Sequence, residues 1–192
     1  MGKIFCLMGK SGTGKDTVLK LLLQDNNLAL KSVVSYTTRP IRTCEQHGRE
    51  YFFLSERELE EFEFRGKIIE KRVYNTVDGL WYYCTIDDGQ IDLKKGNFVL
   101  ISTLDGYIKL SDYFGKDNVE PIYLKVDDGT RLQRALDREK SQDNPKSDEL
   151  CRRFLADNED FSEENLLNAG IKEFFLNDDL GKCLEKIIER LG

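Results

Sequence analysis

A glycine-rich turn near the amino terminus constrains this chain more than any other feature. Residues 9–15 read Gly-Lys-Ser-Gly-Thr-Gly-Lys, the spacing G-x-x-x-x-G-K, between an apolar run that predicts a strand and a segment with helical spacing of apolar residues. Glycines let the backbone wrap around a phosphate, and successive amides and the helix N-terminus then point at it. We therefore expect a phosphate-binding loop rather than an ordinary tight turn. The residues expected to bind phosphates are Gly9, Lys10, Ser11, Gly12, Thr13, Gly14, Lys15, Asp16 and Thr17.

The residue after Lys15 departs from the usual motif, which has Ser or Thr there to ligate Mg²⁺ through its hydroxyl. Asp16 stands in that place, followed by Thr17. A carboxylate is also a good Mg²⁺ ligand, but it adds negative charge beside the phosphates. Asp16 is therefore our candidate metal ligand, and we expect a site that depends strongly on the metal.

Charge and composition exclude several other classes of function. Among 192 residues, 29 Lys and Arg stand against 35 Asp and Glu, and a net charge of −6 disfavours general nucleic-acid binding. No apolar run approaches the ~20 residues that span a bilayer. The five cysteines show no C-x-x-C spacing and His47 is the single histidine, so neither a zinc site nor a His-based triad is expected. We expect a cytoplasmic protein with reduced thiols and no nucleic-acid or membrane partner.

Strand and helix patterns alternate along most of the chain, which argues for a parallel sheet covered by helices. The clearest element is the last helix, in which an apolar stripe runs from Leu180 to Leu191. Predicted strands cover 3–8, 28–36, 97–103, 120–126 and 172–176, and predicted helices cover 16–24, 105–114, 130–140, 148–158 and the final segment.

Between about 37 and 85 the alternation is interrupted, and we interpret this stretch as an inserted lobe. Two β-like runs, 67–74 and 80–85, are joined by an Asp78-Gly79 turn. A helix at 55–66 precedes them, because Ser55 and Glu58 form a capping-box pattern.

The lobe begins with a second candidate phosphate site. Arg39 and Arg42 lie three residues apart, with Pro40 stiffening the loop between them, so that two guanidiniums can fork around one phosphate. Tyr51 and Tyr83 could donate hydroxyls to the same group. As an isolated feature, two arginines in a loop are more often solvated than functional.

Taken together, these motifs resemble those of guanylate kinases over nearly the whole chain. Glu70 and the run 82–85 (Tyr-Tyr-Cys-Thr) stand where that family has a Glu and then Y-Y-G-S/T, and 176–180 (Leu-Asn-Asp-Asp-Leu) matches its V-N-D-D-L. The family's acceptor pattern, roughly S-x-T-T-R-x-x-R followed by G-x-x-Y-x-F, is matched by Ser35, Thr37, Thr38, Arg39, Arg42, Gly48, Tyr51 and Phe53.

The resemblance implies an α/β fold: a P-loop kinase core with a parallel sheet flanked by helices, an inserted mixed β/α GMP-binding lobe and a helical lid. It implies a single domain over 1–192. The core would comprise 1–34, 96–137 and 154–192, the lobe about 35–95, and the lid about 138–153.

The resemblance also assigns roles to residues, with ATP and GMP as the small-molecule substrates. Glu70 would accept from the adjacent N1–H and N2–H donors of guanine, and would thereby select guanine over adenine. Asn177 would lie by the adenine of ATP. The residues implied to bind GMP are Ser35, Arg39, Arg42, Tyr51, Glu70, Tyr83, Thr85 and Thr103.

Arginines gather around a polar break at 141–147 that would belong to the lid. By resemblance, Arg138 and Arg153 reach the transferring phosphoryl group, with Arg152 a near rival, and together with Lys15 they form the candidate catalytic set. A solvated helix face fits Arg131 and Arg134 better.

Three departures from the family pattern leave metal handling and the acceptor base open. Asp16 replaces the loop hydroxyl. The family's D-x-D-x-x-G reads Ile-Ser-Thr-Leu-Asp-Gly at 101–106, so both acids are missing and Thr103 stands in place of one. The segment between Glu70 and Tyr83 is a few residues longer and carries Trp81.

The implied reaction is ATP-dependent phosphorylation of GMP or dGMP by direct in-line transfer, with Mg²⁺ as cofactor. A phosphate monoester has a second pKa of about 6, so it attacks without a histidine base, and catalysis reduces to positioning and charge neutralisation. The alternatives are a kinase for another phosphorylated acceptor on the same fold, or a non-catalytic guanylate-kinase-like interaction module. Modules of that kind typically lack an intact phosphate loop, which this chain has.

Overall fold

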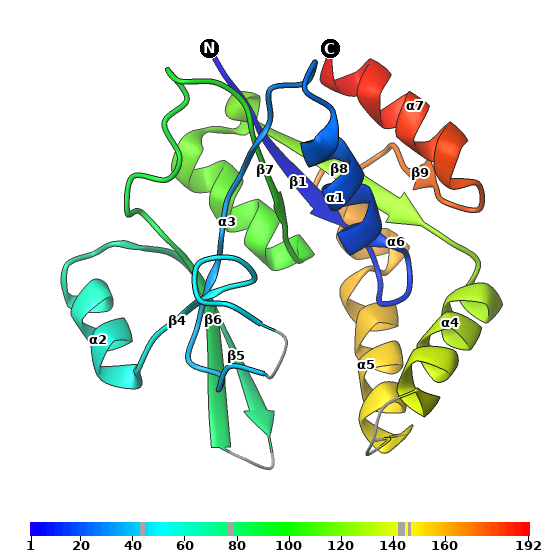
Figure 1. Cartoon of the computed structure of the whole chain (residues 1–192), viewed down its shortest axis with the longest axis horizontal. Coiled ribbons are helices and arrows are strands. Elements are labelled where there is room, and N and C mark those ends of the chain that lie inside the picture. The colour runs from blue at the N-terminus through cyan, green and yellow to red at the C-terminus, as the bar shows by residue number, and fades with distance from the viewer. Residues whose placement is uncertain (43–44, 77–78, 142–144, 146) are drawn as a thin grey trace.

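A five-stranded parallel sheet carries the glycine-rich loop at the end of its central strand (Figure 1). The computed structural model describes residues 1–42, 45–76, 79–141, 145 and 147–192. In spatial order, the strands are β2 (Lys31–Ser32), β7 (Phe98–Ile101), β1 (Ile4–Met8), β8 (Val119–Lys125) and β9 (Phe175–Leu176). The predicted parallel sheet is confirmed, with strand bounds shifted by a few residues.

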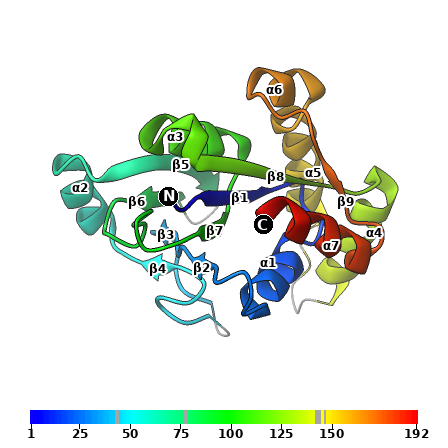
Figure 2. The ribbon, with the colours of Figure 1, turned by 90° about the horizontal axis from the view of Figure 1, so that it is seen from above.

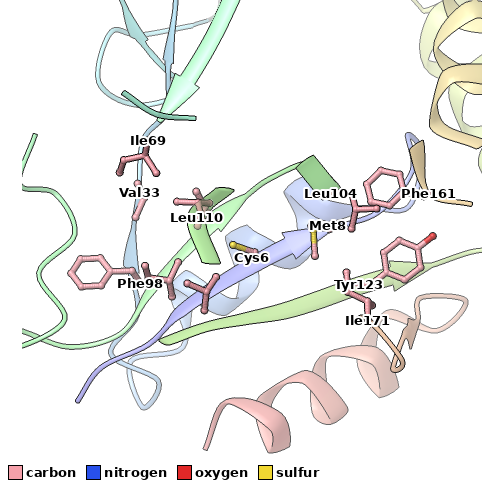
Figure 3. Close-up of a cluster of buried hydrophobic side chains, with 13 residues drawn as sticks. Cys6, Met8, Val33, Ile69, Phe98, Leu104, Leu110, Tyr123, Phe161 and Ile171 are labelled. Carbon is pink, nitrogen blue, oxygen red and sulfur yellow. The ribbon is translucent and has the colours of Figure 1, made fainter. Parts of the chain in front are cut away.

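Helices cover both faces of this sheet (Figure 2). Because side chains alternate along a strand, β1 sends Cys6 and Met8 to one face and Phe5 and Leu7 to the other. The first face packs against α3 (Leu104–Phe114), as Figure 3 shows for Cys6, Leu104 and Leu110. The second face packs against α1 (Lys15–Gln24) and α7 (Leu180–Leu191). The central strand is therefore buried on both sides, which holds the loop at its end in place.

A second, four-stranded sheet forms most of the stretch interpreted as an inserted lobe. Its order is β4 (Phe52–Phe53), β3 (Tyr36–Thr37), β6 (Gly79–Ile86) and β5 (Ile68–Thr76), with β5 and β6 antiparallel. Helix α2 (Glu56–Phe64) packs on it through Leu59. The capping box is confirmed, because the Ser55 hydroxyl accepts from the Glu58 amide while the Glu58 carboxylate accepts from the Ser55 amide. Asp78 of the predicted turn lies outside the described residues.

The prediction of one strand over 28–36 is wrong. Lys31 and Ser32 pair with β7 of the first sheet, whereas Tyr36 and Thr37 pair with β6 of the second. Between them, the Val34 amide donates to the Gln90 side chain instead of to a strand. The apolar run thus crosses from one sheet to the other, which its hydrophobicity alone could not indicate.

Two helices, α4 (Asp128–Lys140) and α5 (Ser147–Asp160), stand beyond the parallel sheet and opposite the β5–β6 hairpin (Figure 1). Residues 142–144 and 146 of the predicted polar break lie outside the described part of the chain. A short helix that the sequence analysis did not predict, α6 (Glu163–Asn168), follows α5, and a 3₁₀ helix spans Lys116–Asn118. No helix among the described residues is long and apolar enough to cross a membrane. The proposed division into core, lobe and lid stays a prediction.

The apolar stripe of α7 provides a test of how side chains pack on the second face of the parallel sheet. Ile187 is fully buried against Phe5, Leu7 and Leu22 in one cluster. Ile187→Ala should lower the free energy of unfolding by about 2–5 kcal/mol, because the side chain leaves a cavity that its neighbours cannot fill. Leu167→Ala on α6, where the leucine is exposed, should change it by less than about 0.5 kcal/mol. Urea unfolding measures both, and equal effects would contradict this packing.

Candidate functional site

The phosphate-binding loop (residues 9–15) has a backbone that only glycine permits at its key positions. Gly9, Gly12 and Gly14 have φ values of 152°, 83° and 87°. A Cβ on Gly12 would lie 2.6 Å from the carbonyl oxygen of Arg131, and one on Gly9 would lie 2.7 Å from that of Leu124. The loop is thus wrapped tightly against β8 and α4, with α1 starting directly behind it.

The ammonium of Lys15 curls back over this loop. It donates to the carbonyl oxygens of Gly9 (2.6 Å) and Lys10 (3.1 Å). Burial lowers the pKa of Lys15, and the carboxylates of Asp157 and Asp16 oppose that effect. A partly desolvated cation at the N-terminus of a helix is suited to binding an anion.

A cavity of about 570 Å³ opens in front of the loop and gathers positive charge from three elements. Arg138 of α4 and Arg153 of α5 line it together with Lys15, so the structure brings these three predicted catalytic residues together. Arg152 does not line it: its side chain is 56% exposed and is paired with Glu149 of its own helix. The other lining residues are Ser11, Gly12, Gly14, Asp16, Thr17, Arg134, Asn177, Asp178 and Leu180.

Asn177 lines this cavity. Its amide nitrogen donates to the carbonyl oxygen of Thr13 at 2.8 Å, which fixes the side chain against the loop. Its Oδ1 atom is buried and has no hydrogen-bond partner among the described residues. A buried acceptor of this kind is suited to a ligand that brings an N–H donor.

The interpretation as a solvated residue is wrong for Arg131. The guanidinium of Arg131 is fully buried, stacks at 3.9 Å on the Phe154 ring and donates to Asp128 and Asn158. Arg134 is exposed but lines the cavity and donates to the carbonyl oxygen of Gly12 at 3.3 Å. The spacing of 131, 134 and 138 (i, i+3, i+7) was a signal in the sequence, since it places all three on one face of α4.

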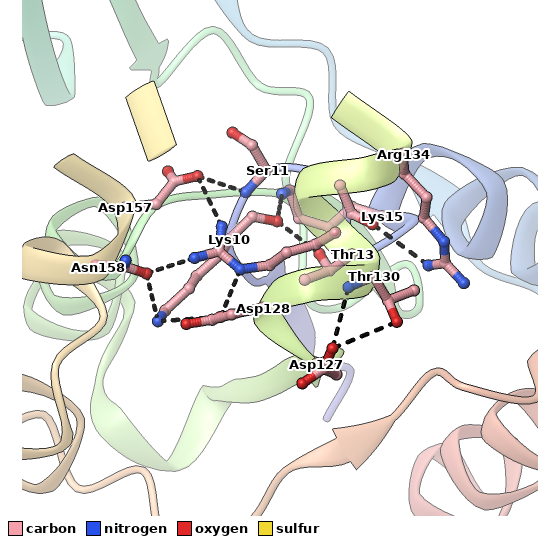
Figure 4. A network of polar contacts seen from close by, with 12 residues as sticks. Lys10, Ser11, Thr13, Lys15, Asp127, Asp128, Thr130, Arg134, Asp157 and Asn158 are labelled. Carbon is pink, nitrogen blue, oxygen red and sulfur yellow. Dashed lines mark hydrogen bonds and ion pairs between the residues drawn. The ribbon is translucent and has the colours of Figure 1, made fainter. Parts of the chain in front are cut away.

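A polar network joins α5 to the loop (Figure 4). The Ser11 amide donates to the Asp157 carboxylate at 2.6 Å, and the Lys10 ammonium donates to Asn158 at 2.8 Å. Asp128 of α4 lies 3.9 Å from the same ammonium. The helix that carries Arg153 is thereby tied to the phosphate-binding loop.

The second sheet carries a separate candidate anion site around Arg39. This guanidinium is buried, donates to the Tyr83 hydroxyl at 3.1 Å and lies 5.6 Å from the Tyr51 ring. Glu45 pairs with it bidentately at 2.8 and 3.0 Å and also accepts from the Arg42 amide. The structure therefore brings Arg39, Tyr51 and Tyr83 together, whereas the Arg42 side chain is exposed.

Glu70 and Thr85 meet at one end of this second sheet. Glu70 is buried and accepts from the Thr85 hydroxyl at 2.9 Å. It also accepts two hydrogen bonds from Arg72, a residue that the sequence analysis did not single out. Its i+2 spacing from Glu70, which places both side chains on one face of the strand, was the available signal.

Thr103 borders the same region, and Ser35 lies next to β3 of the same sheet. Thr103 is the N-cap of α3, and its hydroxyl accepts from the Gly106 amide. A Cβ on Gly106 would lie 3.8 Å from the Glu70 carboxyl carbon, so the first turn of α3 faces Glu70. Ser35 is half-buried, and its carbonyl oxygen accepts from the Phe52 amide.

Asp16 is exposed in the first turn of α1 and lines the cavity. It is not the N-cap, a position that Gly14 occupies without any side-chain hydrogen bond. No group of three or more His, Cys, Asp or Glu side chains that could hold a metal exists among the described residues. One carboxylate beside a phosphate pocket nevertheless fits Mg²⁺, which takes one or two carboxylates and fills its remaining positions with phosphate oxygens and water.

A parallel sheet whose central strand feeds a phosphate-binding loop, with arginines from two further helices turned toward that loop, defines the class of P-loop nucleotide kinases. The family model described as guanylate kinase matches residues 1–88. The guanylate kinases of Chlorobaculum tepidum and Porphyromonas gingivalis are 31% and 32% identical to the chain. The alignments cover 100% and 97% of this chain and 92% and 95% of those proteins. The chain belongs to the guanylate kinase family.

A solved structure supports the fold independently. The crystal structure of guanylate kinase from Anaplasma phagocytophilum matches with a TM-score of 0.69 at 20% sequence identity. The match covers 99% of this chain and 84% of that one, so the shared architecture extends across both sheets.

The buried guanidinium of Arg131 generates a stability prediction. Arg131→Ala should lower the free energy of unfolding by about 3 kcal/mol, because it removes the stack on Phe154 and the hydrogen bonds that Arg131 donates to Asp128 and Asn158. Arg134→Ala, one turn further along α4 and exposed, should change it by less than about 0.5 kcal/mol. Thermal unfolding of the two variants makes the comparison, and a neutral Arg131→Ala would contradict the structural role of this residue.

Proposed function

We propose that this chain transfers the γ-phosphoryl group of ATP to GMP. Membership of the guanylate kinase family carries the reaction class, and the observation that supports it best is the presence of two separate clusters of cationic side chains, each of which could bind a phosphate. One is the cavity at Lys15, Arg138 and Arg153, and the other surrounds Arg39. Burial raises the pKa of Tyr51, and Tyr83 adds to that effect, so the Tyr51 hydroxyl keeps its proton and can donate it to a phosphate.

The charged side chains of the two clusters decide which substrate we assign to each. ATP would occupy the cavity, with its phosphates on the loop amides and Lys15 and its adenine amino group donating to the free Oδ1 atom of Asn177. The GMP phosphate would replace Glu45 on Arg39 and meet the hydroxyls of Tyr51 and Tyr83, with Arg42 and Ser35 at the rim. Glu70, Thr85 and Thr103 would form the base end of the acceptor site.

The reaction needs no general base, because the acceptor phosphate is largely dianionic at neutral pH. Arg138 and Arg153 would neutralise charge on the transferring group, and closure of α4 and α5 would exclude water. Mg²⁺, when bound, would neutralise charge on the ATP phosphates, and Asp16 would hold it or one of its water ligands.

The test is release of ADP from ATP with GMP, AMP, CMP and UMP as acceptors. We expect GMP to be used with a kcat/KM at least about 100-fold above that for AMP. Turnover of another monophosphate in place of GMP would support the alternative acceptor kinase. Tight ATP binding without turnover of any acceptor would support the interaction module.

The lid arginines are predicted to act on the transfer step rather than on acceptor binding. Arg138→Ala and Arg153→Ala should each lower kcat by about 100-fold or more, because their charge is needed chiefly when the phosphoryl group is in transit. The KM for GMP should change by less than about threefold. Arg152→Ala is the matched control, since its neighbour on α5 does not line the cavity, and it should stay near the parent. A raised KM with kcat intact would place these arginines on the acceptor instead.

Asp16 is predicted to couple the metal to ATP. Asp16→Asn should need clearly more Mg²⁺ for half-maximal rate, because a carboxylate ligand is lost. It should bind metal-free ATP at least as tightly as the parent, because a negative charge near the phosphates is gone. Calorimetry with and without Mg²⁺ gives the binding result. If the variant shows an unchanged Mg²⁺ dependence and only a lower melting temperature, the role of Asp16 is limited to a favourable charge at the start of α1.

A reducing, cytoplasmic setting is part of the same proposal. Cys6, Cys84, Cys151 and Cys183 are free thiols, and Cys44 lies outside the described residues. Burial raises the pKa of Cys6, Cys84 and Cys183, so these three remain protonated and serve as packing.

A further inference from the structure

We propose that Tyr74 is a positioning residue for the acceptor phosphate: it holds the ring of Tyr83 so that the Tyr83 hydroxyl meets that phosphate. The inference rests on the proposed function and adds a residue to the phosphate end of the acceptor site. It also gives a role to the lengthened segment between Glu70 and Tyr83, in which Tyr74 lies.

The orientation of the Tyr83 ring decides whether its hydroxyl can serve a phosphate. The hydroxyl accepts a hydrogen bond from Arg39 Nε at 3.1 Å. A phenolic hydroxyl that accepts one hydrogen bond still has its own proton to donate. A tilt of the ring would carry this proton away from Arg39, and therefore away from an anion bound to that guanidinium.

Two aromatic rings hold the Tyr83 ring edge to face. The centroid of Tyr51 lies 5.6 Å away with the planes at 73°, and that of Tyr74 lies 5.4 Å away with the planes at 88°. Aromatic pairs prefer this arrangement. In the sheet order β4-β3-β6-β5, Tyr51 directly precedes β4 and Tyr74 lies on β5, so the two rings approach Tyr83 from opposite sides of β6.

The register of the hairpin places Tyr74 against Tyr83. Arg72 lies directly opposite Tyr83 in the antiparallel β5–β6 pair. Tyr74 follows Arg72 by two residues on β5, so both side chains stand on the same face of the sheet. Tyr74 is therefore the diagonal neighbour of Tyr83, a separation that aromatic side chains can bridge.

Tyr74 lies outside the packed part of its sheet. Strand β3 pairs with β6 at Tyr83 and Cys84, whereas Tyr74 and its opposite residue Trp81 lie further along the hairpin, which extends past β3 (Figure 1). The Tyr74 side chain is 38% exposed. Packing in a core does not account for an aromatic ring at this place, but support of the Tyr83 ring does. The added length of the β5–β6 segment provides the position for it.

The experiment compares the parent with Tyr74→Ala, Tyr74→Phe, Tyr83→Phe, the double variant Tyr74→Ala/Tyr83→Phe, and Val73→Ala. Dissociation constants come from calorimetry, and kcat and KM come from ADP release. Val73 is the matched control, because it is the neighbouring residue of β5, points to the opposite face and is 54% exposed. Tyr74→Val keeps a residue that favours a strand and serves if the alanine variant does not fold.

We expect Tyr74→Ala to raise the dissociation constant and the KM for GMP by about three- to tenfold, the loss of one aromatic pair. The KM for ATP and the preference for GMP over AMP should each stay within about twofold of the parent, because the two acceptors carry the same phosphate. Tyr74→Phe should regain most of the affinity for GMP, since it restores the ring. Val73→Ala should behave as the parent.

The double variant separates positioning from a merely structural role. Tyr83→Phe should itself weaken GMP binding, because the hydroxyl is lost. Adding Tyr74→Ala should then weaken binding by less than about twofold further, because the ring that Tyr74 holds no longer carries a hydroxyl. A residue that only stabilises the hairpin would lower the melting temperature of both backgrounds and leave the affinity for GMP unchanged.

The inference is overturned if Tyr74→Ala binds GMP as Val73→Ala does, if the losses of Tyr74→Ala and Tyr83→Phe add, or if the preference for GMP over AMP changes. A failure of the proposed function looks different, because the parent then phosphorylates no GMP. Any monophosphate brings the same group to Arg39, so the calorimetric cycle with the monophosphate that binds still decides whether Tyr74 positions Tyr83.

Discussion

The buried guanidinium of Arg131 connects the parts of the structure that face the phosphates. The backbone carbonyl oxygen of Arg131 lies so close to Gly12 that no side chain fits at position 12. The Arg131 guanidinium stacks on Phe154 of α5 and donates to Asn158. Asn158 in turn accepts from Lys10 of the phosphate-binding loop. One side chain of α4 therefore sets the distance between the loop and the helix that carries Arg153, and a displacement at Arg131 would move both.

Most of the cations proposed to bind phosphates lie beside carboxylates, in a chain whose net charge is negative. Arg39 is held by Glu45, Arg72 by Glu70, and Arg153 lies near Glu139 and Glu149. Asp157 and Asp16 stand beside Lys15. These pairs orient the guanidiniums without substrate and keep the site close to neutral, so an incoming phosphate must replace a carboxylate or use a free edge of the cation. The pairing favours selectivity over strength of binding.

Elements defined by local spacing were predictable from the sequence. The glycine-rich loop, the Ser55–Glu58 capping box and the α7 stripe each depend on residues within a few positions of one another, and local backbone geometry decides them. The run at 28–36 was not predictable, because its first half pairs with residues 67 positions further along the chain (Lys31 with Phe98), whereas Tyr36 pairs with Cys84, 48 positions further along. Helix α6 was not predictable either, because its 6 residues follow a Ser162 cap but make too few turns to show a period.

For the candidate site, the sequence by itself determined the chemistry: a phosphate loop ending in Lys15 and Asp16, paired arginines at 39 and 42, and an arginine-rich segment near 138–153. The tertiary structure decided which of these groups converge. In the folded chain, Arg138 and Arg153 line the cavity at the loop, whereas Arg152 lies on the surface. Arg131 is buried, and Arg72 donates to both carboxylate oxygens of Glu70. The physical reason is that the charge and hydrogen-bonding capacity of a side chain are set by the residue type, whatever its position in the fold. Burial and the choice of partner depend on strands and helices that the chain brings together from far apart.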